Sequence, residues 1–165
     1  MEELLAKVKK KPKIKMTRSE LALQEKENYC ICSVLQGIFK EHELHISQDE
    51  IADNLSPSNR GHLVHDDKIK DFLKSRGLDY NFYWHNETPF NEPDSLLEEI
   101  CVNSGFIGIG IHTYRILAFA YPETIVDDPK DAKRKTFNLQ ELMHELRKFG
   151  GGFGLIKKIK LYSKM

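Results

Sequence analysis

The order of the apolar patterns constrains the fold of this chain most. Apolar residues recur at helical spacing over residues 30–40, 47–55, 65–77 and 96–101, and again after Asn138. Strand-like runs occupy residues 80–84, 106–112, 114–120, 124–126 and 153–162. Helices therefore come mainly first and strands mainly second, with one late helix. This order predicts an α+β fold, in which an N-terminal helical half packs on a C-terminal antiparallel sheet.

Length and charge limit the classes of protein to which the chain can belong. Its 165 residues are enough for one domain with a sizeable core, and 40% of them are apolar. We expect residues 19–165 to form that domain, preceded by a basic arm over residues 1–18 with an edge strand around Lys13–Met16. The formal net charge is zero, so no overall field favours nucleic acid or a membrane surface as a partner.

The cysteine count and the apolar runs predict a cellular compartment. The chain has three cysteines, an odd number, and its N-terminal segment is not apolar enough for a signal peptide. These features argue against a disulfide framework and predict a reducing, cytoplasmic protein without a membrane segment. No phosphate-binding glycine loop or nucleic-acid motif occurs, so we expect no cofactor. Nothing in the sequence indicates an oligomeric state.

Cys30 is the best candidate for a nucleophile. It comes one residue before an apolar stripe of helical period that begins at Ile31, so it should lie in the first turn of a buried helix. Helix N-termini present N–H groups and the positive end of the helix dipole. Both stabilise a thiolate and predict a lowered thiol pKa. Cys32 is the alternative nucleophile, although it would lie deeper in the helix, and buried cysteines are often only small core residues.

Gln24 lies six residues before Cys30, where its side-chain amide could donate to the oxyanion that forms during attack on a carbonyl. A Gln-x5-Cys pattern that opens a buried helix resembles papain-like cysteine peptidases. The longer pattern, with Ile46–Ala52 and Gly77-Leu78, resembles the bacteriocin-leader-processing (double-glycine, C39-like) peptidases. Those usually have Cys-Gly-Pro-Ala-Ser, whereas this chain has Cys-Ile-Cys-Ser-Val over residues 30–34.

His112 and Asp128 complete the set that the resemblance implies. In the resembled peptidases the catalytic histidine opens an apolar strand, and an Asp-Pro pair closes the next strand. Here Asp128-Pro129 follows His112 across one hairpin. A simple turn at Tyr121–Glu123 would not place the two side chains directly opposite, so we expect a bulge or a diagonal contact. Asp127 could replace Asp128 as the group that orients the imidazole.

The resulting prediction is a cysteine peptidase that hydrolyses a peptide or amide bond of a peptide or protein substrate. Cys30 is the nucleophile, His112 the base, Asp128 the orienting group and Gln24 the oxyanion donor. An acyltransferase or deamidase could use the same residues, and a non-catalytic peptide-binding module could keep the fold. The close pairs His42/His45, His62/His65 and Cys30/Cys32 suggest zinc ligands more weakly, because Cys-x-Cys inside a helix is too tight for the usual site.

Overall fold

A six-stranded antiparallel sheet organises the protein. The computed structural model describes residues 23–56, 66–86 and 93–159. Within them the strands are β1 (Leu78–Trp84), β2 (Ser104–Ile109), β3 (His112–Ala120), β4 (Glu123–Asp128), β5 (Lys133–Asn138) and β6 (Gly151–Lys158). The strand order is β1-β6-β2-β3-β4-β5, and every neighbouring pair is antiparallel. The α+β prediction is therefore confirmed.

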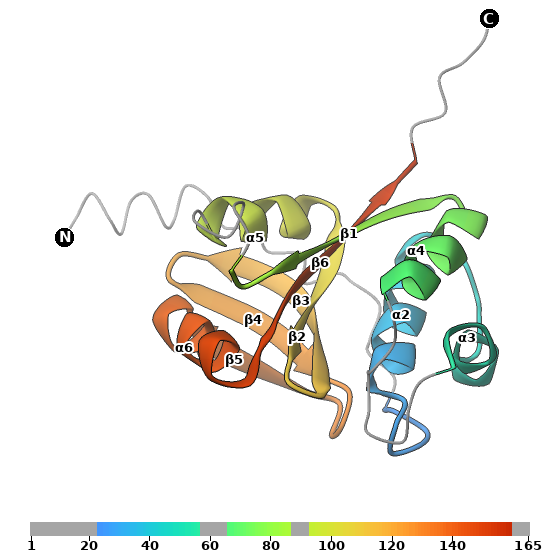
Figure 1. Cartoon of the computed structure of the whole chain (residues 1–165), viewed down its shortest axis with the longest axis horizontal. Helices are drawn as coiled ribbons and strands as arrows, with labels where there is room; N and C mark the ends of the chain where they lie inside the picture. The colour runs from blue at the N-terminus through green and yellow to red at the C-terminus, as the bar shows by residue number, and fades with distance from the viewer. Residues whose placement is uncertain (1–22, 57–65, 87–92, 160–165) are drawn as a thin grey trace, which may run out of the picture.

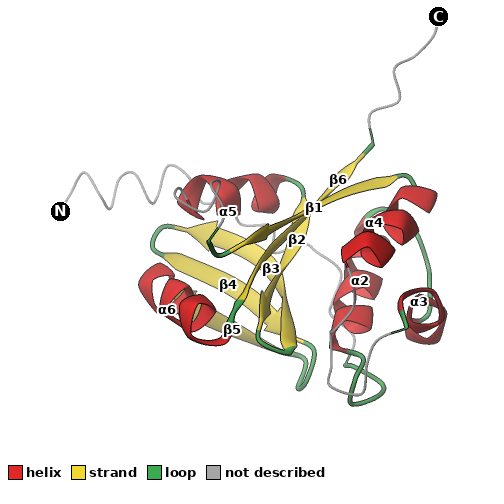
Figure 2. Cartoon of the chain, in the orientation of Figure 1, coloured by secondary structure: helices red, strands yellow, loops and turns green. Residues whose placement is uncertain are grey.

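The helices form two groups beside this sheet (Figure 1). One group is α2 (Cys30–Glu41), α3 (Gln48–Leu55) and α4 (Asp66–Ser75); the other is α5 (Pro93–Val102) and α6 (Leu139–Phe149). Coloured by element, the first group stands at the right of the strands, while α5 lies above them and α6 at their lower left (Figure 2). The expected helical half is thus the first group, and the later helices belong with the sheet.

Two buried apolar clusters hold these groups to the strands. The first cluster joins α2, α3 and α4 to Tyr80, Phe106 and Ile156 of the sheet. The second joins α5 and α6 to β2, β3, β4 and β6. Burial of apolar surface contributes roughly 25 cal/mol per Å². The apolar stripes of α2, α4, α5 and α6 pack against the sheet, whereas that of α3 packs against α2 and α4.

Local hydrogen bonds fix where the helices begin. Ser47 Oγ accepts the N–H of Glu50 at 3.1 Å, as expected for the N-cap of α3. Asn138 Oδ1 accepts the N–H of Gln140 at 2.9 Å and caps α6 in the same way. The helix α2 begins at Cys30, which is the boundary that the apolar stripe predicted. These starts depend on neighbouring residues only, which is why the sequence could reveal them.

Three features of the strands differ from the expectations. Residues 133–138 form the edge strand β5, which the sequence did not predict. Gly151 and Gly152 belong to β6, although the glycine run was expected to break the chain. The strand expected to end at His112 ends at Ile109, since Gly110 turns the chain with φ of 58°. The expected basic arm and edge strand over residues 1–18 lie outside the described residues.

A membrane span is absent from the part of the chain that the structure describes. None of the helices there is both long enough and apolar enough to cross a bilayer.

Candidate active site

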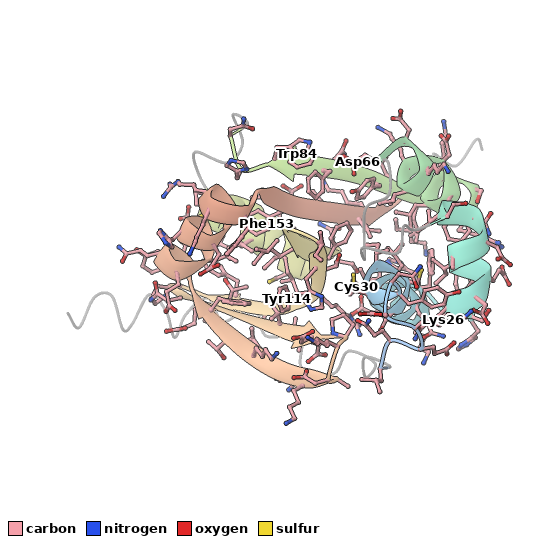
Figure 3. The ribbon with its side chains drawn as sticks, turned by 60° about the horizontal axis from the view of Figure 1, so that its bottom comes forward. Lys26, Cys30, Asp66, Trp84, Tyr114 and Phe153 are labelled. Carbon is pink, nitrogen blue, oxygen red and sulfur yellow. The ribbon has the colours of Figure 1, made fainter. Side chains whose placement is uncertain are left out.

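The Cys30 thiol lies where the helix α2 meets the start of β3. Cys30 is the first residue of α2 and is 2% exposed. Its Sγ lies 3.8 Å from the carbonyl oxygen of Ile111 and 3.8 Å from Oγ1 of Thr113. These two residues flank His112 in the chain. Figure 3 shows Cys30 on the side of α2 that faces the strands. The fold therefore brings the predicted nucleophile to the segment that carries the predicted base.

Burial changes the expected acidity of this thiol. Removal from water raises the pKa of Cys30, while the Thr113 hydroxyl and the N–H groups of Thr113, Ile31 and Cys30 itself act in the opposite direction. The net shift is upward. The helix N-terminus was expected to lower this pKa, and the structure corrects that expectation because desolvation is the larger effect. The thiol therefore stays protonated at neutral pH until a base accepts its proton.

The alternative nucleophile, Cys32, is less suited to the chemistry. Its side chain is 0% exposed and belongs to the apolar cluster under α2. Burial raises its pKa to about 12, and the neighbouring Cys30 adds to the effect. Of the two thiols in this helix, Cys30 is the one at the helix end and against the His112 segment. Cys101 is also a buried free thiol, in the second apolar cluster.

His112 and Asp128 form a direct contact across the β3–β4 hairpin. His112 Nε2 lies 2.6 Å from Oδ1 of Asp128. The pairing register shifts between Ile116 and Ala118, so that Arg115 lies opposite Asp127. Asp128 then falls one position further along, nearest to Tyr114, and reaches His112 diagonally on the same face. The hairpin length predicted a bulge or a diagonal contact, and both are present.

Asp128 is fixed by further donors besides the imidazole. The N–H of Lys130 donates to its Oδ1 at 2.9 Å, and the ammonium of Lys135 donates to its Oδ2. Burial raises the pKa of Asp128, but the hydrogen bonds from Lys135, Lys130 and His112 outweigh that effect and hold the pKa below its usual value. Asp127 instead faces Arg134 at 3.6 Å. Of the two candidate carboxylates, Asp128 is the one in contact with His112.

Gln24 lies in the loop before α2, close to the Asp128 turn. Its backbone N–H donates to the carbonyl of Pro129 at 3.0 Å. Its side-chain Nε2 donates to the carbonyls of Lys26 at 3.0 Å and Glu27 at 2.9 Å. Its Oε1 has no hydrogen-bond partner among the described residues. The loop thus joins the site, but the amide donors are engaged within it, and donation to an oxyanion requires exchange of one of these bonds.

Several polar residues at the site escaped the sequence analysis. Thr113 contacts the Cys30 sulfur, Lys135 binds Asp128, and Gln48 binds the loop on both sides of Gln24. The alternation of side chains along a strand could have indicated Thr113, because it places the Thr113 side chain on the opposite face from His112 and Tyr114. Lys135 lies seven residues from its partner Asp128, and Gln48 lies 23 and 25 residues from its partners Glu25 and Leu23. Nothing local in the sequence indicates these pairings.

The suggested zinc ligands do not assemble in the described part of the chain. No group of three or more His, Cys, Asp or Glu side chains there could hold a metal ion. His62 and His65 lie outside the described residues.

Comparison with known proteins supports the fold through structure alone. No family model and no curated protein sequence matches the chain. A solved double-glycine-motif protease from an AMS/PCAT transporter, in complex with a leader peptide, superposes with a TM-score of 0.65 at 16% identity, covering 89% of this chain and 97% of that one. The peptidase domain of Streptococcus ComA, a bifunctional ABC transporter involved in quorum sensing, gives 0.62 at 17% identity, over 86% and 98%. The chain has the papain-like, C39-type peptidase fold of these domains.

Proposed function

We propose that the chain is a cysteine peptidase that hydrolyses a peptide or amide bond through Cys30, His112 and Asp128. One observation carries the proposal. The His112 imidazole is bound to Asp128 at 2.6 Å, while the Cys30 sulfur lies 3.8 Å from atoms of the residues on either side of His112. The thiol of α2 thus lies against the chain segment that carries the imidazole–carboxylate pair of β3 and β4, and this placement supports the proposal. Such an arrangement is what nucleophilic catalysis by a thiol requires.

The proposed reaction begins with proton transfer from the Cys30 thiol. Because Nε2 of His112 is engaged with Asp128, the other ring nitrogen, Nδ1, takes the proton. The thiolate then attacks the carbonyl carbon of the scissile bond, and the carbonyl oxygen takes the negative charge. The backbone N–H of Cys30 and the side-chain amide of Gln24 donate to this oxyanion.

The intermediate collapses when the leaving amine receives the proton from His112. A thioester to Cys30 remains, and water activated by the neutral imidazole hydrolyses it. Throughout these steps Asp128 keeps the ring orientation and balances the imidazolium charge. Its lowered pKa supports this role, since the carboxylate stays ionised over the whole neutral range.

We further propose a peptide or protein as the substrate and the cytoplasm as the compartment. The first of the two similar structures was solved with a leader peptide, which supports an extended peptide as the type of ligand. The three cysteines are free thiols, as expected in a reducing environment.

A non-catalytic peptide-binding module is the second candidate function. Two observations favour it: burial raises the pKa of Cys30, and the Gln24 amide donates within its own loop. In such a module the fold would bind a peptide, but the thiol would not be activated. The two functions differ in the state of the Cys30 thiol, which can be measured without a known substrate.

The test is the rate of Cys30 alkylation by iodoacetamide as a function of pH. In the peptidase, pairing with the imidazolium brings the thiol pKa of the wild type below the usual value of about 8.5. In His112→Ala the imidazolium is lost, and burial outweighs the remaining hydrogen bonds to the sulfur, so the midpoint moves above about 8.5. Mass spectrometry locates the adduct, and Cys30→Ala gives the background from the two other thiols. His144→Ala, at an exposed histidine of α6, is the matched control and should behave as wild type.

A wild-type midpoint above about 8.5 that is unaffected by His112→Ala overturns the peptidase and leaves the binding module. A lowered midpoint that depends on His112 leads to peptide-library cleavage assays, in which Cys30→Ser should abolish product formation.

A further inference from the structure

We infer that Gln48 is a positioning residue, which holds the oxyanion loop (residues 23–29) at a fixed place relative to the nucleophile helix. The inference rests on the proposed function and extends it to a residue that touches no reacting atom. Gln48 is the first residue of α3 and is 0% exposed, although its neighbours Asp49 and Glu50 are exposed. A buried amide in the first turn of a surface helix is costly unless it is hydrogen bonded.

The Gln48 amide binds the main chain on both sides of Gln24. Its Oε1 accepts the N–H of Glu25 at 2.9 Å, and its Nε2 donates to the carbonyl of Leu23 at 3.1 Å. One planar group thereby fixes the peptide units that flank the predicted oxyanion donor. The backbone of Gln24 is thereby held in place, while its side-chain amide donates to the carbonyls of Lys26 and Glu27. The backbone N–H of Gln24 also donates to Pro129, beside Asp128, which holds the loop from its other side.

The same amide connects this loop to the helix that carries the nucleophile. Gln48 Nε2 also donates to Oε1 of Gln36 at 3.1 Å. Gln36 lies on α2, six residues after Cys30, and its own Nε2 donates to the carbonyl of Ile46 at 3.2 Å. The distance between Gln24 and Cys30 is therefore set by a short series of hydrogen bonds between buried or half-buried groups. An uncharged amide suits the place because it offers an acceptor and two donors together.

A second contact from α3 supports the far end of the loop. The hydroxyl of Tyr29 donates to Oδ1 of Asp49 at 2.8 Å, and Lys26 lies 3.4 Å from the same oxygen. Figure 3 shows Lys26 near α3, away from the strands. The ion pair between Lys26 and Asp49 is exposed, so its contribution to stability is small compared with that of the buried Gln48 amide. The beginning of α3 thus binds the oxyanion loop at both ends, and Gln48 is the buried part of that contact.

The test compares two reactions of the same thiol. In acylation by p-nitrophenyl acetate, the thiolate forms a C–S bond to the carbonyl carbon, the carbonyl oxygen becomes an oxyanion, and p-nitrophenolate leaves to give an acetyl thioester. In alkylation by iodoacetamide, the thiolate displaces iodide from a saturated carbon and no oxyanion forms. The thiol proton goes to His112 in both reactions. Only acylation depends on the oxyanion donors.

In Gln48→Met we expect acylation to slow about 10- to 100-fold while alkylation changes less than about twofold. Gln24→Ala should have the same pattern, and the double variant Gln24→Ala/Gln48→Met should be no slower than Gln24→Ala alone, because both changes remove one interaction. Gln140→Met is the matched control, since Gln140 is an exposed glutamine in the first turn of α6. Both of its rates should equal those of the wild type.

Equal losses in both reactions would mean that Gln48 only stabilises the helix around Cys30, and would overturn the inference. The inference would also be overturned if Gln48→Met left the acylation rate unchanged, or if the losses of acylation rate in the two single variants multiplied in the double variant. Should Gln48→Met fail to fold, Gln36→Met removes one of the partners of Gln48 and gives the same comparison. A wild-type protein that is acylated no faster than Cys30→Ala instead refutes the peptidase itself, so the two failures are distinguishable.

Discussion

Replacement of Arg115 by methionine should strongly destabilise the protein, because it breaks a buried ion pair between the two halves of the site. Arg115 lies on β3 with a side chain that is 0% exposed, and its Nη2 is 2.8 Å from Oε1 of Glu41 on α2. The Glu41 carboxylate is 13% exposed and also accepts the hydroxyl of Ser104 at 2.9 Å. The pair connects the helix that begins at Cys30 with the strand that begins at His112.

The expected magnitude follows from what the substitution leaves behind. Methionine fills much of the aliphatic volume, but the Glu41 carboxylate loses its cation in a largely dehydrated place. Removal of one partner of a buried pair costs about 3–5 kcal/mol. Since the Ser104 hydroxyl and slight contact with solvent still stabilise the Glu41 carboxylate, we expect the free energy of unfolding to fall by about 3 kcal/mol. For a chain of this length that corresponds to a decrease in Tm of roughly 6–12 °C.

The assay is urea unfolding followed by circular dichroism, with Arg134→Met as the control. Arg134 is 49% exposed and 3.6 Å from Asp127, so its loss should change the free energy of unfolding by less than about 0.5 kcal/mol. Arg115→Met/Glu41→Leu removes the carboxylate as well and should recover about 2 kcal/mol relative to Arg115→Met. A single variant within about 1 kcal/mol of wild type, or a double variant no more stable than the single one, would refute the argument.

Two further predictions test the surroundings of the site. Gly37→Ala should destabilise the wild type by about 1–3 kcal/mol, because the new Cβ would lie 2.7 Å from Nη1 of the buried Arg115. In the Arg115→Met background the same change should instead stabilise the protein by up to about 1 kcal/mol, since alanine is the better helix former. Chemical denaturation of the wild type, the two single variants and the double variant measures this reversal of sign. Lys135→Met should cost about 0.5–1 kcal/mol at about pH 7, as the lysine is 40% exposed. The pKa of Asp128 is lowered in the folded state, so this stabilisation is present above the unfolded value of about 3.9 and is lost as pH falls through the folded value. The difference between Lys135→Met and wild type should therefore shrink on acidification to about pH 3, and a difference that grows there would contradict the role of Lys135.

Local patterns were sufficient for most of the helices and for the order of the site residues. The starts of α2 and α3 depend on an apolar stripe and on a serine cap, which are both properties of neighbouring residues. The length of the β3–β4 hairpin also indicated that His112 could not lie directly opposite Asp128, so that a bulge or a diagonal contact was needed, and the structure has both.

Edge and crowding effects were beyond local patterns. The strand β5 is rich in lysine, arginine and polar residues. Among the described strands it pairs with β4 alone, at the edge of the sheet, where charged side chains protect against unwanted pairing. Its alternation of buried and exposed positions is correspondingly weak. Gly152 lies within the strand β6, and the position needs glycine because a Cβ there would be 2.0 Å from the carbonyl oxygen of Tyr83. A glycine run that looks like a break is thus required by a neighbour about 70 residues away in the chain.

The sequence determined most element types and, together with its resemblance to C39-like peptidases, the candidate residues Gln24, Cys30, His112 and Asp128 and their order along the chain. Periodicity, caps and turns are short-range properties, and they are written in consecutive residues. Only the tertiary structure decided that Asp128 rather than Asp127 contacts His112, that burial outweighs the helix N-terminus in the pKa of Cys30, and that the buried Gln48 amide binds the loop around Gln24. Desolvation and hydrogen bonds between distant segments depend on what packs against each group, and that is fixed only when the helices and the sheet come together.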